Sequence, residues 1–181
     1  MNICGQKRGH VGKNVGNKYH VSMENTSDFV LRNYHFGESE RASDIRGLKS
    51  KEERAHFKNL LEKGDEWTSH YMHLALVKND ELIGDIQLRR CFETMPPGVA
   101  HVGIDVLESF RGQGAGTRGL ELVWEWALRN NFHRLEGSTD ASNIGAQKAF
   151  MKAGWNFEGT LKNLFVIDGI GHDFLSYAKT R

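Results

Sequence analysis

The sequence is poor in cysteine and proline and lacks a long apolar run. Of its 181 residues, two are cysteines and two are prolines. Cys4 and Cys91 form no CxxC motif and no disulfide framework, so we expect a protein of the reducing cytoplasm. No apolar run is long enough to cross a bilayer, and the N-terminal segment has no apolar h-region. We therefore expect neither a membrane partner nor a secretory signal.

Charge of one sign is not in excess either. The chain carries 24 Lys and Arg against 23 Asp and Glu, which gives a formal net charge of +1. Dedicated nucleic-acid-binding proteins usually have a basic excess, so no direct nucleic-acid partner is expected. The nine histidines are scattered and include no HExxH motif, so we expect no metal site.

The remaining composition is typical of one α/β domain. Hydrophobic residues make up 39% and charged residues 26% of the chain, which suits a folded domain of this length. Residues 1–26 are rich in Gly, Asn and Lys without periodicity, and we predict a flexible leader there. A single domain is expected over residues 27–181.

Apolar periodicity predicts a mixed order of strands and helices. Strands are expected at residues 29–32, 73–77, 82–88, 99–107, 134–139, 155–161 and 172–178. Helices are expected within 38–63, around 120–128 and at 143–153. Polar turns at 78–81 and 168–169 would close hairpins. The order predicts an antiparallel meander, one β-α-β crossover, and then a helix and a hairpin.

A glycine-rich turn, Arg111-Gly-Gln-Gly-Ala-Gly116, joins the strand at 99–107 to a helix. Glycines allow successive backbone N–H groups to point into one concavity, and the helix start adds free N–H groups and a positive dipole end. Arg111 adds a positive charge and Thr117 a hydroxyl. The segment therefore predicts a site for a diphosphate.

Two other phosphate-binding motifs fit this turn less well. No Gly-Lys-Ser/Thr follows, so it is not a P-loop. Gly114, Gly116 and Gly119 match GxGxxG, with Glu136 near the next strand. A dinucleotide-binding domain usually carries that fingerprint after its first strand, with several β-α units following. Here antiparallel strands come first, so a dinucleotide-binding protein is the weakest alternative.

The same residues resemble the GCN5-related N-acetyltransferase (GNAT) superfamily. Residues 111–116 match its Arg/Gln-x-x-Gly-x-Gly/Ala motif, and Asn143-Ile-Gly-Ala146, Phe150 and Gly154-Trp155 match its next helix. The resemblance covers roughly residues 27–181. It implies the α/β GNAT fold, with a mixed, mostly antiparallel sheet flanked by helices and splayed at the fourth strand.

Three further segments are similar to the Rim-type branch, the ribosomal-protein N-acetyltransferases. They are the opening strand at 29–32, the Glu-Gly-Thr-Leu-Lys element at 158–162, and the closing strand from Gly169 through Asp173 to Tyr177. This similarity favours a protein N-terminal amine as the acceptor.

The resemblance implies acetyl-CoA as the co-substrate. The pyrophosphate would lie on the amides of residues 113–117, and the pantetheine would pair with the backbone of 105–107. Asn143 would hydrogen-bond the pantetheine, and Phe150 would pack beside the thioester. The implied cofactor residues are Asp105, Val106, Leu107, Arg111, Gly112, Gln113, Gly114, Ala115, Gly116, Thr117, Asn143 and Phe150.

Transfer to an amine requires a base that removes a proton from the amine. Where many relatives carry Glu, this chain has His101, whose reference pKa of ~6.5 suits neutral pH. Asp105, on the same strand face by two-residue alternation, is the second candidate.

The general acid is less well defined, because Phe150 and Ala146 stand where relatives carry Tyr and Ser. Tyr177 and Ser142 are the alternatives. The thiolate can also leave unassisted, since a thiol pKa is ~8.5.

We therefore expect a cytoplasmic acetyl-CoA-dependent N-acetyltransferase that acts on a primary amine, with a protein N-terminus favoured. A small-molecule amine (an aminoglycoside, a polyamine or an amino-acid-like toxin) is the alternative acceptor, and a non-catalytic acyl-CoA-binding module is the alternative of another class. The oligomeric state stays open, with a homodimer among the alternatives.

The acceptor pocket is expected within residues 36–72 and 89–98. Four carboxylates in the first of these segments, Glu38, Glu40, Asp65 and Glu66, would favour a cationic acceptor if they lined it.

Overall fold

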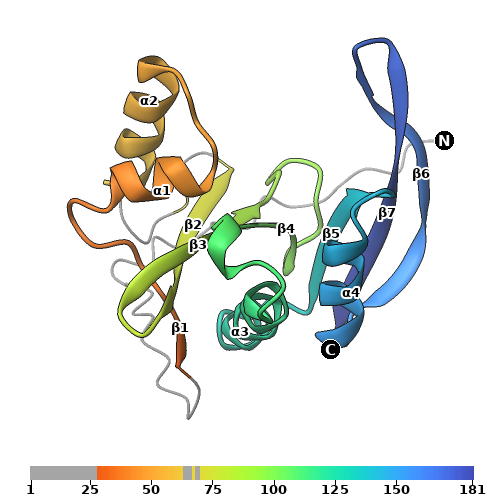
Figure 1. Cartoon of the computed structure of the whole chain (residues 1–181). Helices are drawn as coiled ribbons and strands as arrows, with labels where there is room; N and C mark the ends of the chain where they lie inside the picture. Colours follow the sequence, from red (N-terminus) through yellow and green to blue (C-terminus); the bar gives the residue numbers. More distant parts are fainter. Residues whose placement is uncertain (1–27, 63–66, 68–69) are drawn as a thin grey trace, which may run out of the picture.

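The computed structural model describes residues 28–62, 67 and 70–181, so the predicted leader at 1–26 lies outside the described residues. The described chain forms a seven-stranded sheet with helices on both faces (Figure 1). Its elements are β1 (Phe29–Arg32), α1 (Ser39–Ile45), α2 (Lys51–Leu61), β2 (Tyr71–Lys78), β3 (Glu81–Arg89), β4 (Val99–Val106), a 3-10 turn η1 (Glu108–Phe110), α3 (Ala115–Arg129), β5 (Arg134–Asp140), α4 (Ile144–Lys152), β6 (Asn156–Ile167) and β7 (Ile170–Thr180).

The periodicity located every strand and helix, and the structure adds length at one hairpin. β6 and β7 continue beyond the predicted strands to a turn at Asp168 and Gly169. The chain at the outer end of this hairpin is largely exposed, so no alternation of buried and exposed residues marks it in the sequence.

The turn between β2 and β3 lies where it was predicted. Asn79 and Asp80 both have positive φ there, 49° and 63°, which is typical of a two-residue hairpin turn.

The sheet has the order β1-β2-β3-β4-β5-β7-β6 and is antiparallel except between β4 and β5. The β4–β5 pairing consists of Val99 with Arg134, Ala100 with Leu135 and His101 with Glu136. Both strands continue past these pairs, β4 to Val106 and β5 to Asp140. The sheet is therefore splayed beyond His101, as predicted for the fourth strand.

The face of the sheet that carries α3 and α4 holds the larger core. Alternate β4 residues, Ala100, Val102, Ile104 and Val106, belong to or pack against this core. Their neighbours His101, Gly103 and Asp105 are thus directed to the opposite face by the two-residue strand period.

Helices α1 and α2 cover the other face through a smaller core. Its buried members are Ala42, Ile45, Phe57, Leu61, Ala75, Val77 and Leu82. α2 begins at a capping box, in which the Ser50 side chain accepts the N–H of Glu53 and the Glu53 carboxylate accepts the N–H of Ser50.

In the described part of the chain, no helix is long and apolar enough to cross a membrane. The same residues hold no group of three or more His, Cys, Asp or Glu that could bind a metal ion.

A glycine directly follows the last β5 residue that pairs with β4, and it packs closely against Phe150 where the two strands separate. A Cβ at Gly137 would lie 2.7 Å from Cζ of Phe150 and 3.4 Å from the carbonyl oxygen of Val102. Gly137→Ala should therefore lower the free energy of unfolding by about 1–3 kcal/mol, because the aromatic ring must shift.

The control is Gly103→Ala on β4, whose Cβ would meet its nearest atom, Oε1 of Gln87, at an ordinary 3.5 Å. This variant should change the unfolding free energy by less than about 1 kcal/mol. Urea unfolding measures both, and equal stability of the two variants would contradict the tight packing of Phe150 against β5.

Candidate active site

A pocket of about 480 Å³, here called the splay pocket, opens between the separated part of β4, the N-terminal end of α3 and one side of α4. Its lining residues are Ile104, Asp105, Val106, Arg111, Gly112, Gly114, Gly116, Thr117, Asn143, Gly145, Ala146, Lys148, Ala149 and Lys152. Most of the predicted cofactor residues are in this set. One pocket therefore brings together the strand, the glycine-rich turn and the second helix that the sequence singled out.

Four predicted cofactor residues do not line the splay pocket. Leu107 packs against the smaller core. The Gln113 amide donates to the carbonyl of Ser109 at 2.7 Å. Ala115 and Phe150 are 2% and 4% exposed. Gln113 and Ala115 were expected to act through backbone N–H groups, which the placement of their side chains does not affect.

The N-terminus of α3 has the geometry of an anion site. Gly114 caps the helix in the left-handed region with φ 86°, and no side chain caps the helix end. Gly112 also has a positive φ of 73°. A Cβ at either glycine would meet no atom within 4 Å, so the space before these amides is open to a ligand. Free N–H groups at a helix start bind phosphate groups, and the residues present fit the pyrophosphate of a CoA molecule.

Three cationic side chains surround this helix end. Nε of Arg111 donates to the carbonyl of Val106 at 3.0 Å, which holds its guanidinium beside the pocket. Lys148 and Lys152 line the pocket from α4. Neither lysine was predicted from the sequence. They are four residues apart, which places them on one helix face, and this spacing could have identified them.

Asn143 combines two roles in one position. Its Oδ1 accepts the N–H of Ala146 at 3.0 Å and so caps α4. The residue also lines the splay pocket. The cap uses the side-chain oxygen and leaves the amide NH₂ group available as a donor.

Phe150 and Tyr177 lie in the core beneath the splay. Their rings stack with centroids 4.9 Å apart and an interplanar angle of 3°. Tyr177 is 3% exposed and does not line the splay pocket. Its role as a general acid stays a prediction. The alternative, Ser142, donates its hydroxyl to Asp140 at 2.6 Å.

His101 is the last β4 residue that pairs with β5, so it stands where the two strands part. Its Nε2 lies 3.2 Å from a carboxylate oxygen of Glu136, which also pairs with Arg134 at 2.6 Å. Partial burial lowers the pKa of His101 below its ordinary value, Glu136 opposes that shift, and Arg89 and Arg134 add to it. The imidazole is therefore neutral near pH 7 and can accept a proton.

Asp105, the second candidate base, lies four residues further along β4, about 13 Å away at the strand rise. Its carboxylate is 3.4 Å from Nη1 of Arg46. Burial raises the pKa of Asp105, Arg46 lowers it, and Asp85 raises it. The two candidate bases therefore lie at opposite ends of the separated part of the strand.

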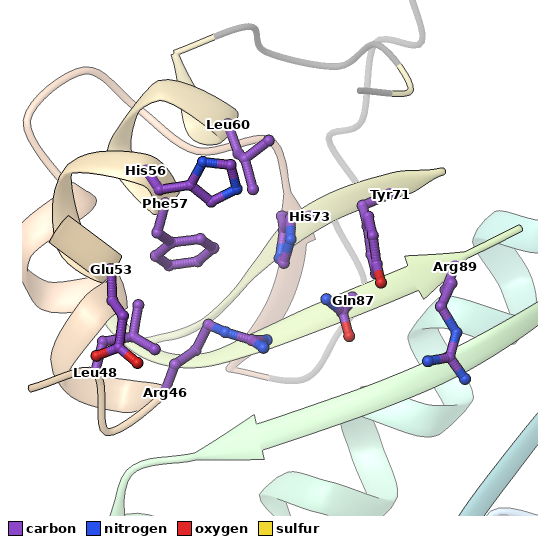
Figure 2. A pocket seen from close by; sticks show the side chains of 10 residues that line it. All are labelled: Arg46, Leu48, Glu53, His56, Phe57, Leu60, Tyr71, His73, Gln87 and Arg89. Atoms are coloured by element: carbon purple, nitrogen blue, oxygen red, sulfur yellow. The ribbon is translucent and has the colours of Figure 1, made fainter. Parts of the chain in front are cut away.

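A second pocket of about 560 Å³ lies on the face covered by α1 and α2, and Figure 2 shows its side chains. We call it the helix-side pocket. It is lined by Arg46, Leu48, Glu53, His56, Phe57, Leu60, Tyr71, His73, Gln87 and Arg89. Most of these residues fall in the segments predicted to hold the acceptor, and β2 and β3 add His73 and Gln87.

A buried carboxylate organises the floor of this pocket. Asp85 is fully buried and accepts hydrogen bonds from the Tyr34 hydroxyl at 2.8 Å, from Nη1 of Arg46 at 2.7 Å and from Nδ1 of His73 at 3.1 Å. Burial raises the pKa of Asp85, but His73 and Arg46 outweigh it, so the net shift is downward. This cluster was not predicted from the sequence, although Asp85 is a charged residue inside an apolar strand and could have indicated it.

Two of the four carboxylates that would favour a cationic acceptor if they lined the pocket are engaged elsewhere. Glu38 pairs with Arg32 at 2.7 Å, and Glu40 pairs with Arg54 at 3.0 Å. Neither lines the helix-side pocket. Asp65 and Glu66 lie outside the described residues.

Comparison with known proteins identifies the class that this fold and site define. The model of the Acetyltransferase (GNAT) family matches residues 38–155. This match covers more than half of the chain, so the protein belongs to the GNAT family and is an acetyltransferase. The family uses acetyl-CoA. Membership removes the dinucleotide-binding alternative and confirms the resemblance drawn from the motifs.

Named relatives agree with this assignment. The chain is 26% identical over 139 residues to a probable N-acetyltransferase, YjcK, of Bacillus subtilis. The aligned residues cover 74% of this chain and 72% of the relative. The fold is shared with RimL, a ribosomal L7/L12 α-N-protein acetyltransferase solved with coenzyme A (TM-score 0.71, 18% identity, 89% and 98% of the two chains). It is also shared with a spermidine N-acetyltransferase SpeG chimera of Vibrio cholerae and hSSAT (TM-score 0.70, 16% identity, 85% and 96%).

The glycine-rich turn gives the first binding prediction. Gly114→Val should abolish CoA binding in a folded protein, because the side chain would occupy the space before the helix N-terminus and strain a positive φ. The control is Gly47→Val, which has a similar φ of 70° and open surroundings but lines neither pocket. Isothermal titration with CoA measures both. Unchanged affinity in the Gly114 variant would contradict the assignment.

The three cationic side chains at the start of α3 give the second binding prediction. Arg111→Gln and the double variant Lys148→Gln/Lys152→Gln should each weaken CoA binding, more at 20 mM than at 500 mM salt, because salt screens exposed charges. Arg129→Gln, at the far end of α3, removes the same charge outside the pocket and should have no effect. A salt-independent loss would indicate that these residues act through structure rather than charge.

Proposed function

We propose that this protein is a cytoplasmic N-acetyltransferase that moves an acetyl group from acetyl-CoA to a primary amine, with a protein N-terminal amine as the favoured acceptor. The observation that carries the proposal is the placement of two pockets on opposite faces of the sheet: the splay pocket lies along the separated part of β4, and the helix-side pocket lies over the neighbouring strands β2 and β3. The splay pocket has a free helix N-terminus and three cations. The helix-side pocket lies on the face to which His101 is directed.

Acetyl-CoA, when bound, supplies an acetyl thioester. The backbone N–H groups at the start of α3, with Arg111, Lys148 and Lys152, would hold its phosphate groups. The separated backbone of β4 offers hydrogen-bonding groups to the pantetheine, since its β5 side has no strand partner beyond His101.

His101 is the proposed base for the acceptor amine. A free alkyl amine has a pKa near ~10, so at neutral pH it must lose a proton before it attacks the acyl carbon. A neutral imidazole at the splay can accept this proton directly or through water, and Glu136 at 3.2 Å then stabilises the imidazolium. The new N–C bond forms as the C–S bond breaks, and the electron pair leaves on sulfur as a thiolate.

A hydroxyl acid is not needed for this step. Phe150 and Ala146 supply no hydroxyl, and Tyr177 is buried against Phe150. Because a thiol pKa of ~8.5 makes the thiolate a good leaving group, we propose that CoA leaves unassisted.

The choice of a protein N-terminus rests on the named activity of structural relatives such as RimL. A polyamine, as in the spermidine acetyltransferase relative, would require acidic pocket walls. The described carboxylates Glu38 and Glu40 are held by arginines elsewhere.

A thiol-release assay with acetyl-CoA tests the proposed function. Purified protein should release CoA with N-terminal peptides and not in their absence, and mass spectrometry should show one acetyl group on the α-amine. No CoA binding and no turnover with any amine would overturn the proposal. CoA binding without turnover on any amine would favour the acyl-CoA-binding module.

The pH dependence identifies the base. Because burial lowers the pKa of His101, kcat/KM should rise with pH through a midpoint below ~6.5. His101→Ala should remove this limb and reduce the rate by ~10²–10⁴. Asp105→Asn should keep the limb and most of the rate. The reverse result would assign the base to Asp105, and near-normal turnover in the double variant would exclude both.

A further inference from the structure

The helix-side pocket is lined by more cationic groups than acidic ones. Arg46, Arg89, His56 and His73 line it, and Glu53 is the one carboxylate among its described lining residues. The pocket's preference for an acceptor therefore depends on which of these charges are already compensated within the protein.

The carboxylate of Glu53 is already engaged in the structure of α2. Its Oε2 accepts the backbone N–H groups of Ser50 at 3.1 Å and Lys49 at 3.3 Å, as part of the capping box. Turning this carboxylate towards an amine in the pocket would break the helix cap, at a cost in stability.

The charge of Arg46 is compensated too. Its Nη1 lies 2.7 Å from the buried Asp85 and 3.4 Å from Asp105. Nδ1 of His73 donates to the same Asp85. The charges of these groups at the base of the pocket are therefore paired with one another.

Arg89 differs from Arg46 in this respect. It is exposed at the end of β3 and has no carboxylate within ion-pair distance among the described residues. Figure 2 shows Arg89 at one end of the helix-side pocket, with Gln87 between it and Arg46. Arg89 thus provides a positive charge on the pocket wall that no carboxylate of the described residues pairs with.

The register places this charge beside the proposed base. Arg89 on β3 is directly opposite His101 on β4, and directly opposed residues have Cβ atoms about 5 Å apart. Arg89 is also close enough to help lower the pKa of His101. An amine held at His101 would therefore have its near substituents within reach of the Arg89 guanidinium.

We propose that the acceptor carries an anionic group, a carboxylate about 5 Å from the reacting amine, and that Arg89 binds it. This inference rests on the proposed function. Two sources present this chemistry: a peptide whose first residue is Asp or Glu, and a free acidic amino acid. Arg89 would bind such a carboxylate in a charge-assisted, bidentate pair and would repel a cationic acceptor.

The experiment compares acceptors that differ in charge and little else. The acceptors are C-terminally amidated Asp-Ala-Ala, Asn-Ala-Ala and Lys-Ala-Ala, with free aspartate and asparagine as the small-molecule arm. The proteins are the wild type, Arg89→Gln, the charge-reversed Arg89→Glu, and Arg129→Gln as a control outside both pockets. Thermal unfolding and CoA titration verify that each variant is folded and binds CoA.

The wild type should acetylate Asp-Ala-Ala about 10- to 100-fold more efficiently in kcat/KM than Asn-Ala-Ala, the range expected for a charged hydrogen bond. Lys-Ala-Ala should be poorer still. Arg89→Gln should reduce the Asp-to-Asn ratio to near one by acting on the Asp substrate, and Arg89→Glu should favour Lys-Ala-Ala. Arg129→Gln should match the wild type. A preference confined to the peptides, or to the free amino acids, identifies the source of the anion.

The outcomes separate this inference from the proposed function. Turnover of amines without a charge preference, or with a preference that survives in Arg89→Gln, overturns the inference and leaves the acetyltransferase proposal intact. If no acceptor turns over, titration of N-acetyl-Asp-Ala-Ala amide against the CoA-bound protein decides. Binding weakened by Arg89→Gln but not by Arg129→Gln supports the inference, and any other result overturns it.

Discussion

The short pairing between β4 and β5 is the constraint on which the site depends. Three residue pairs join the strands before they separate. Directly beyond them, Gly137 leaves room for the Phe150 ring, which is stacked on Tyr177. This packing lies where the strands separate, and beyond it the backbone of the second half of β4 faces a pocket instead of a strand. Backbone N–H and C=O groups need partners, and a ligand that lies along β4 would supply them. The open amides of α3 would then bind the same ligand at its phosphate end.

The opposite face depends on Asp85. A buried carboxylate is costly unless it is paired and hydrogen-bonded, and removal of one partner leaves an uncompensated charge. Here the partners come from separate segments: Tyr34 follows β1, Arg46 ends α1 and His73 lies on β2. Arg46 also reaches Asp105 on β4. The buried Asp85 therefore connects the segments around the helix-side pocket and, through Arg46 and Asp105, connects them to β4.

The sequence predicted local features well and non-local ones poorly. The β2–β3 turn, the start of α4 after Asn143 and the glycine-rich turn were predictable because each depends on residues adjacent in the chain. The proposed role of Arg89 was not predictable, because it depends on the β3–β4 register, which no local sequence pattern specifies. Whether Glu38 and Glu40 line the acceptor pocket could not be predicted either, because it depends on the fold, which pairs them with Arg32 and Arg54 away from that pocket. The outer half of the β6–β7 hairpin was missed because its exposed residues show no alternation.

Amide hydrogen exchange with and without acetyl-CoA tests the central claim most directly, since it reports on backbone groups of the separated strand. Acetyl-CoA should slow exchange at residues 102–106 of β4 and at 113–117 at the start of α3. The outer hairpin of β6 and β7 should exchange as before. Protection of β4 and the α3 start would show that the ligand occupies the splay. Binding of acetyl-CoA without protection of these two segments would contradict the account.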